Sequence, residues 1–109
     1  MSEALIEYER SGGIAGLRDR LVIQEDGSAV VARRETRREI AVGDAALLRL
    51  LDALQQAQFA VLPPDSRAEG RDLMTYRIVY RGHVVRAMDA AVPPPLQPVL
   101  RLLNEILDR

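Results

Sequence analysis

The chain has 109 residues, 48% of them hydrophobic, and its formal net charge at pH 7 is −1. This length fits one core, so we expect a single domain over residues 1–109. The near-neutral charge argues against a global field that steers the protein to nucleic acid or membranes, and the absence of cysteine excludes a disulfide framework, a thiol nucleophile and cysteine-ligated zinc.

The N-terminal segment, MSEALIEYER, carries acidic residues and lacks the apolar run of a signal peptide. No segment approaches the roughly 20 apolar residues of a membrane span, so we expect a cytoplasmic protein. Residues 3–10 alternate between two faces, which predicts a half-buried strand. One face holds Ala4, Ile6 and Tyr8, and the other mainly Glu3, Glu7 and Glu9.

Two further strands are expected before residue 37. Leu17, Leu21 and Ile23 share one face, which predicts the second strand. Asp26 and Gly27 tolerate positive φ and favour a tight turn, so residues 28–36 are expected to return as the third strand of a hairpin.

The middle of the chain predicts a helix followed by a charged loop. Residues 44–57 read DAALLRLLDALQQA, in which leucines recur at spacings of three and four and form one apolar face. The pair Pro63 and Pro64 ends regular structure. We expect residues 65–72, DSRAEGRD, to be a surface loop.

A second hairpin and a second helix are expected in the last third. Residues 73–81 alternate, residues 81–82 (Arg-Gly) predict a turn, and residues 84–88 predict the returning strand. A proline-rich connector at 91–95 then leads into a final helix, whose apolar stripe runs from Leu96 to Leu107.

The predicted order is therefore β-β-β-α-β-β-α. Hairpins imply antiparallel pairing, and two helices with one apolar face each need one face of a sheet to cover. We expect an α+β fold with an antiparallel sheet of four to five strands and both helices packed on one face. The other face carries Glu and Arg, so we expect it to face solvent.

Candidate catalytic and cofactor sites are poorly supported. His83, the only histidine, lies in a predicted turn, where a solvated side chain is the simplest interpretation. Gly12, Gly13 and Gly16 lack the spacing of a dinucleotide-binding loop, and no spacing suggests a metal site. We expect no enzymatic activity, no cofactor and no bound metal.

Arg33, Arg34, Arg37 and Arg38 form a local basic cluster. Glutamates interrupt it and no aromatic side chains alternate with it for base stacking. We interpret the cluster as a solvated strand end and expect no nucleic-acid binding.

The stretch SGGIAGL, residues 11–17, places Ile14 among three glycines between two predicted strands. Glycine permits positive φ and close backbone approach, so the stretch suits a long hairpin connection. An apolar residue at a loop tip either folds back onto the core or anchors a partner. The spacing alone leaves both alternatives open.

Several segments together resemble the emfourin family: YERSGGIAGLRDRL, LLDALQQAQFAVLPP and YRIVYRGHVVRAMDAAVPPPLQPVLRLL. The resemblance covers nearly the whole chain. The matching residues are Ser11, Gly12, Gly13, Ile14, Ala15 and Gly16 in the first motif and Asp89, Ala91, Pro93, Pro94 and Leu96 in the last. Two departures stand out: Ile14 replaces the commoner phenylalanine, and the segment from Gly27 to Arg38 is longer.

The resemblance implies an inhibitor of protealysin-like, thermolysin-type zinc metalloproteases. Such enzymes cleave before bulky apolar residues, so the hypothesis makes residues Ser11 to Leu17 the protease-binding loop, with Ile14 as the leading anchor and backbone groups pairing with the cleft edge like a substrate strand. Pro93, Pro94 and Pro95 are either a second contact or only set the direction of the last helix.

Other functional classes remain open from the sequence. A non-enzymatic interaction or regulatory module could use the same loop, or a sheet edge, on a different partner. A small hydrolase or nucleic-acid binder would require His83 or the arginine cluster. We expect a monomer, although dimerisation through an edge strand is left open.

Overall fold

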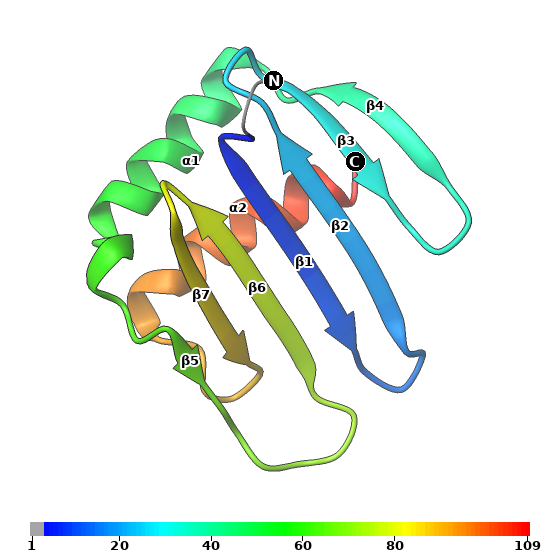
Figure 1. Cartoon of the computed structure of the whole chain (residues 1–109), viewed down its shortest axis with the longest axis vertical. Helices are drawn as coiled ribbons and strands as arrows, with labels where there is room; N and C mark the ends of the chain where they lie inside the picture. The colour runs from blue at the N-terminus through cyan, green and yellow to red at the C-terminus, as the bar shows by residue number, and fades with distance from the viewer. Residues whose placement is uncertain (1–3) are drawn as a thin grey trace.

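The computed structural model describes residues 4–109, and all statements below concern that part of the chain. Its seven strands form one sheet in the order β4-β3-β2-β1-β6-β7-β5. The strands are β1 (Ile6–Gly12), β2 (Leu17–Ile23), β3 (Ser28–Ala32), β4 (Arg37–Ala41), β5 (Asp65–Ser66), β6 (Met74–Tyr80) and β7 (His83–Met88). The long central strands β1, β2 and β6 lie side by side in Figure 1.

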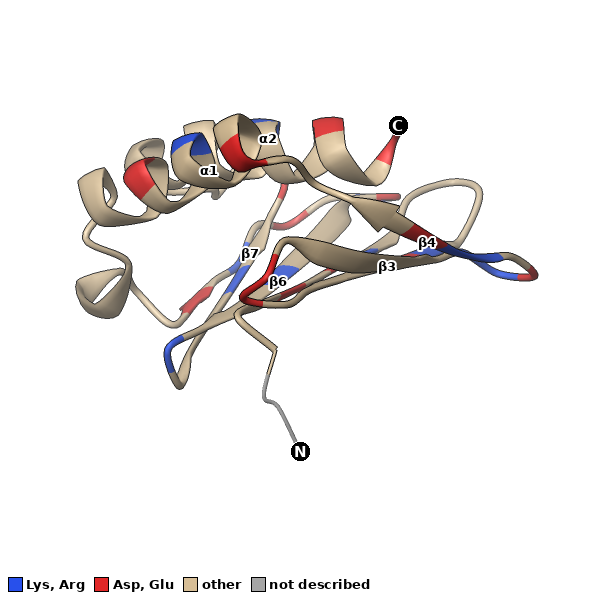
Figure 2. Ribbon diagram, turned by 90° about the horizontal axis from the view of Figure 1, so that it is seen from above, with Lys and Arg blue, Asp and Glu red and all other residues tan. Residues whose placement is uncertain are grey.

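Two α-helices and two 3₁₀ turns complete the fold. They are α1 (Asp44–Gln56), η1 (Phe59–Val61), η2 (Pro94–Leu96) and α2 (Gln97–Leu107). Figure 2 shows both α-helices on the same side of the sheet, which leaves the other face uncovered. This arrangement confirms the expected α+β class and the one-sided helix layer, because each helix has a single apolar face to bury.

The core lies between the sheet and the helix layer. Its largest fully buried side chains come from both layers: Tyr8, Ile6, Leu21, Ile23, Leu50, Leu54, Ile78, Leu96, Leu103, Leu107, Val31 and Val99. The inward residues of the strands follow the alternation seen in the sequence. The helix α2 buries five of its eleven residues, and Pro98 lies in its first turn, where a missing N–H costs least.

The sheet is larger than expected and it is mixed, not purely antiparallel. The predicted third strand, residues 28–36, ends at Ala32 and gives way to a hairpin turn. Arg33 and Thr36 exchange backbone hydrogen bonds of 2.8 and 3.3 Å, and β4 then pairs antiparallel with β3. β4 is a polar edge strand, so it carries no alternating apolar signal.

The second addition is β5, which pairs in parallel with β7. It lies at the start of the segment expected to be a charged loop. The amide of Arg86 donates to the Pro64 carbonyl at 2.9 Å and begins this pairing. The first strand begins at Ile6 rather than residue 3 and continues to Gly12; Glu3 lies outside the described residues.

Candidate functional site

The glycine-rich segment is a hairpin loop between the two central strands. β1 and β2 pair in register from Ile6 opposite Ile23 to Gly12 opposite Leu17. Residues 13–16 are left as the connection, and the Gly16 amide donates to the Gly13 carbonyl at 3.1 Å. Ile14 and Ala15 therefore occupy the two central positions of a tight turn. Figure 1 shows the β1–β2 connection at one end of the sheet.

The glycine at position 12 is required by its neighbour strand. Its φ angle is +100°, and a Cβ atom there would lie 2.6 Å from the carbonyl oxygen of Leu73. The next residue, Gly13, donates its amide to that same carbonyl at 3.4 Å. Only glycine permits both the positive φ and the close backbone approach. The segment before β6 thus holds one side of the loop.

The β3–β4 turn holds the other side of the loop. The Arg34 guanidinium donates to the Gly16 carbonyl, with 3.2 Å between Nη2 and the oxygen. The loop is therefore tied to neighbours on both flanks and by its own turn hydrogen bond. These contacts restrict a segment that its glycines alone would leave free to move.

The tip of the loop is in solvent. The Ile14 side chain is 89% exposed, so it does not fold back onto the core, and Leu17 at the start of β2 is 41% exposed. Ser11, Gly12 and Gly13 are half-buried, while Ala15 and Gly16 are exposed. An isolated apolar side chain projecting from a tied backbone can insert into an apolar pocket of a partner.

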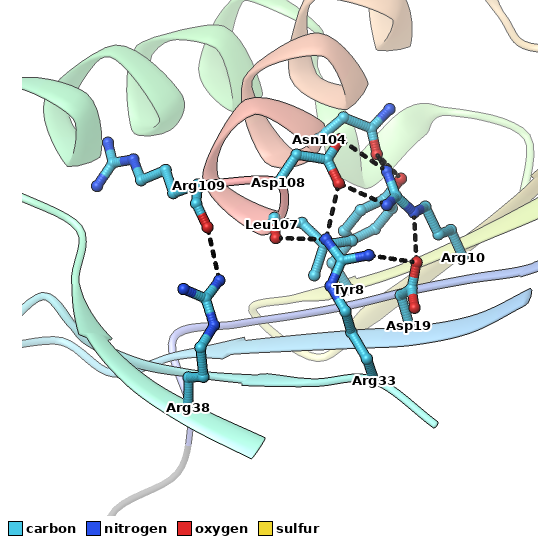
Figure 3. Close-up of polar contacts among 9 residues, drawn as sticks. All are labelled: Tyr8, Arg10, Asp19, Arg33, Arg38, Asn104, Leu107, Asp108 and Arg109. Atoms are coloured by element: carbon cyan, nitrogen blue, oxygen red, sulfur yellow. Dashed lines mark hydrogen bonds and ion pairs between the residues drawn. The ribbon is translucent and has the colours of Figure 1, made fainter. Parts of the chain in front are cut away.

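A partly buried polar cluster fixes the base of this hairpin, and sequence reasoning missed it. Asp19 is only 3% exposed and accepts from Arg10 Nε at 3.0 Å and from Arg33 Nη1 at 3.5 Å. Arg10 continues to the end of α2, where it donates to Asp108 at 2.6 Å and to Asn104 at 3.2 Å. Figure 3 shows these side chains converging between the sheet and α2.

The cluster also includes a buried phenol. The Tyr8 hydroxyl donates to Asn104 Oδ1 at 2.6 Å, and burial raises the pKa of Tyr8 well above its usual value. The pKa of Asp108 is lowered, chiefly by the hydrogen bond from Arg10 and also by the one from Arg33. The cluster joins β1, β2 and the end of β3 to α2. The strand alternation could have revealed this cluster. Asp19 lies two residues before Leu21 in β2, and Arg10 lies two residues after Tyr8 in β1, so both charged residues share the inward face of their strand.

The arginine cluster of the sequence is mostly engaged within the chain. Arg33 donates to the Leu107 carbonyl at 2.9 Å, where a cation at the helix C-terminus is favourable. Arg38 donates to the Arg109 carbonyl at 2.6 Å (Figure 3). Arg34, Arg37 and Arg38 are exposed, as expected for a solvated strand end. In addition, Arg33, Arg34 and Arg38 donate hydrogen bonds within the chain.

Hydrogen bonds to Asp89, called here the Asp89 latch, join the first half of β6 to the end of β7. Asp89 accepts from the Tyr76 hydroxyl at 2.7 Å and from the Met74 amide at 3.2 Å. Burial and the Asp89 carboxylate raise the pKa of Tyr76 to about 12. Because Met74 is paired with Gly12, this latch supports the strand against which the glycine loop rests.

The proline connector is placed apart from the glycine loop. It follows β7, which is two strands from β1 in the sheet. Pro93 is half-buried, while Pro94 and Pro95 are exposed. Among the described residues, no hydrogen bond joins this connector to residues 11–17. The structure thus does not join the two predicted contacts into one site.

The remaining candidates offer little chemistry. His83 is exposed at the start of β7, next to the β6–β7 turn. Within residues 4–109, no group of three or more His, Asp or Glu side chains is arranged to hold a metal ion. Over the same range, neither α-helix is long and apolar enough to cross a membrane.

We compared the sequence with protein-family models and with curated proteins. No protein-family model matches the sequence, and no curated protein matches it. The glycine loop is therefore the candidate site on two grounds: the geometry of the loop and the sequence resemblance described above.

Proposed function

We propose that this protein is an inhibitor of protealysin-like, thermolysin-type zinc metalloproteases, and that residues 11–17 enter the active-site cleft. One observation carries the proposal: Ile14 is 89% exposed at the tip of a loop whose backbone is tied on both flanks. The choice of protease class rests on the sequence resemblance to the emfourin family.

The exposed Ile14 side chain can contribute binding free energy by leaving water. Burying a fully exposed isoleucine in an apolar pocket contributes about 1.5–3 kcal/mol. The loop is already ordered by its contacts with Leu73 and Arg34, so little conformational entropy is lost on binding. An exposed isoleucine on an ordered loop suits the hydrophobic primed-side pocket that the resemblance implies for the target protease.

The loop geometry changes the expected binding mode. A protease binds its substrate as an extended strand, whereas residues 13–16 form a turn closed by the hydrogen bond between Gly16 and Gly13. We therefore propose that Ile14 binds through its side chain and that the turn resists cleavage. In this binding mode the loop backbone does not pair with the cleft edge like a substrate strand.

The test is a titration of the purified protein against a protealysin-like protease, with thermolysin beside it and a serine protease as the control. We expect stoichiometric loss of zinc-protease activity, an untouched serine protease, and an intact inhibitor by mass spectrometry. Cleavage between residues 11 and 17 would make the loop a substrate instead. Inhibition of neither zinc enzyme would refute the proposal and leave a non-enzymatic interaction module for another partner.

A further inference from the structure

A large groove lies at the end of the sheet opposite the glycine loop. Its volume is about 1110 Å³. One wall is α1 from Leu48 onward, with Leu48 and Leu51, and the other is the β6–β7 turn, with Tyr80 and Arg81. Phe59 of η1 contributes to the lining and packs edge-on against Tyr80, with 5.9 Å between ring centroids. The proposed protease-binding loop takes no part in this site.

The rim of the groove exposes large apolar side chains. Leu48 is 67% exposed and Val61 is 74% exposed, and these are two of only five large hydrophobic residues exposed within residues 4–109. Leu51 and Tyr80, which also line the groove, are half-buried. Apolar side chains gathered at the rim of a groove mark a surface that another molecule covers.

The turn that forms one wall has an unfavourable residue at its tip. Tyr80 pairs with His83, and the two residues between them, Arg81 and Gly82, have φ angles of +50° and +77°. Turns with two positive φ angles favour Asn-Gly, because an ordinary side chain is strained there. Gln58, which also lines the groove, follows the end of α1 in the left-handed conformation that commonly terminates a helix. The strain at Arg81 alone therefore points to a use for its side chain.

The charge of Arg81 is available to a ligand. Its guanidinium carbon lies 5.3 Å from the centroid of the Tyr80 ring. Across residues 4–109, Arg81 takes part in no ion pair. The lining contains one carboxylate, Asp52, and it belongs to the opposite wall on α1. A cation beside apolar side chains complements a carboxylate that is itself flanked by apolar groups.

We propose that this groove binds an amphipathic helix of a partner protein, with its apolar face on Leu48, Leu51 and Val61 and an acidic residue paired with Arg81. The groove volume of about 1110 Å³ exceeds the roughly 300–1,000 Å³ of a small-molecule pocket, which favours a protein segment over a small ligand. In this binding mode a helix lies in a groove, and its apolar residues at positions i, i+3, i+4 and i+7 contact the groove.

The test uses two synthetic peptides about 16 residues long, each with the same leucine stripe at helical spacing. One carries a single Glu beside the stripe and the other carries Gln at that position. We expect the Glu peptide to bind the full chain up to about fivefold more tightly than the Gln peptide, which is the upper end of the range for an exposed ion pair. With Arg81→Asn, this difference should fall below about twofold.

Matched variants separate the groove from the fold and from the glycine loop. Arg81→Asn should keep or raise the thermal midpoint, since asparagine suits this turn. Leu48→Gln, at an exposed position, should weaken both peptides about tenfold. Ile14→Asp, at the other end of the sheet, should leave peptide binding unchanged. Failure of both peptides to bind, an equal Glu–Gln difference with Arg81→Asn, or unchanged binding with Leu48→Gln would overturn the proposal.

Discussion

The turns at residues 13–16 and 81–82 both reverse the chain between antiparallel strands, but different residues take their positive φ angles. In the first turn, glycines take these angles and Ile14 projects freely from the tip. In the second, Arg81 takes one of them itself. In the first turn, the glycines set the backbone shape and a different residue, Ile14, is available to a partner. In the second turn, Arg81 takes a positive φ angle and is also the side chain proposed to bind, at a local cost in stability.

The largest expected effect tests the backbone of the first turn. Gly12→Ala should destabilise the protein by about 3 kcal/mol or more, because the new Cβ would meet the Leu73 carbonyl at 2.6 Å and the φ of +100° is strained for alanine. Urea unfolding followed by circular dichroism measures this change.

Gly27→Ala is the matched control for that prediction. Gly27 also has a positive φ, +86°, but nothing lies within 4 Å of the position that a Cβ atom would take there. This substitution should cost only about 1 kcal/mol, the conformational term alone. Equal losses for the two variants would show that the contact with Leu73 contributes nothing.

The second prediction tests the tip of the first turn. Ile14→Asp should raise the inhibition constant toward the target protease at least about tenfold, equivalent to about 1.4 kcal/mol, while the thermal midpoint stays nearly unchanged. The exposed position of Ile14 is the reason for the unchanged midpoint. Enzyme titration and calorimetry on the same preparation measure both quantities.

Leu48→Gln serves as the control for Ile14→Asp. It also alters an exposed apolar residue, but at the opposite end of the sheet, so inhibition should be unaffected. If Ile14→Asp lowered the thermal midpoint sharply, or if both variants weakened inhibition alike, the loop would lose its assigned role.

The third prediction tests the strain in the second turn. Arg81→Asn relieves a left-handed arginine, a gain of about 1–2 kcal/mol, and loses the contact of the guanidinium with the Tyr80 ring, a loss of about 0.5–1 kcal/mol. The two effects leave an expected net gain of about 0–1.5 kcal/mol in the free energy of unfolding. A clear loss of stability would mean that Arg81 supports the fold and that the two turns do not differ as described.

The smallest expected effect tests the polar cluster beneath the first turn. Hydrogen bonds from Arg10 and Arg33 hold the pKa of Asp108 below its usual 3.8. A carboxyl whose pKa is lowered by folding stabilises the native state above its unfolded pKa, and this stabilisation is lost as the pH falls through the folded pKa. Asp108→Asn should therefore be less stable at pH 7, by under about 1 kcal/mol because Asp108 is half-exposed.

The pH dependence distinguishes this electrostatic effect from a change in packing. The difference between wild type and Asp108→Asn should shrink below pH 3.8 and vanish once Asp108 is protonated in the folded state. Urea midpoints measured over a pH series provide the comparison. A difference that stayed constant down to the lowest pH would assign the loss to packing instead.

Local patterns in the sequence were sufficient for much of the fold. The alternation of apolar and polar residues predicted β1, β2, β6 and β7, and the leucine spacing predicted α1 and α2, because one-faced burial leaves a period in the chain. The glycines of residues 11–17 likewise placed a loop between two strands. The role of this loop toward a protease stays a prediction.

Only the tertiary structure decided which distant segments meet. β4 and β5 are short or polar edge strands, so they depend on backbone hydrogen bonds to β3 and β7 rather than on a burial period. The burial of Asp19 depends on Arg10 and Arg33, and the order of the glycine loop depends on Leu73 and Arg34. The groove beside Arg81 exists because α1 and the β6–β7 turn face each other across it. The sequence alone determined the local periodicity, whereas hydrogen bonds and charge pairs between residues far apart in the chain are satisfied only once the sheet and helices are packed.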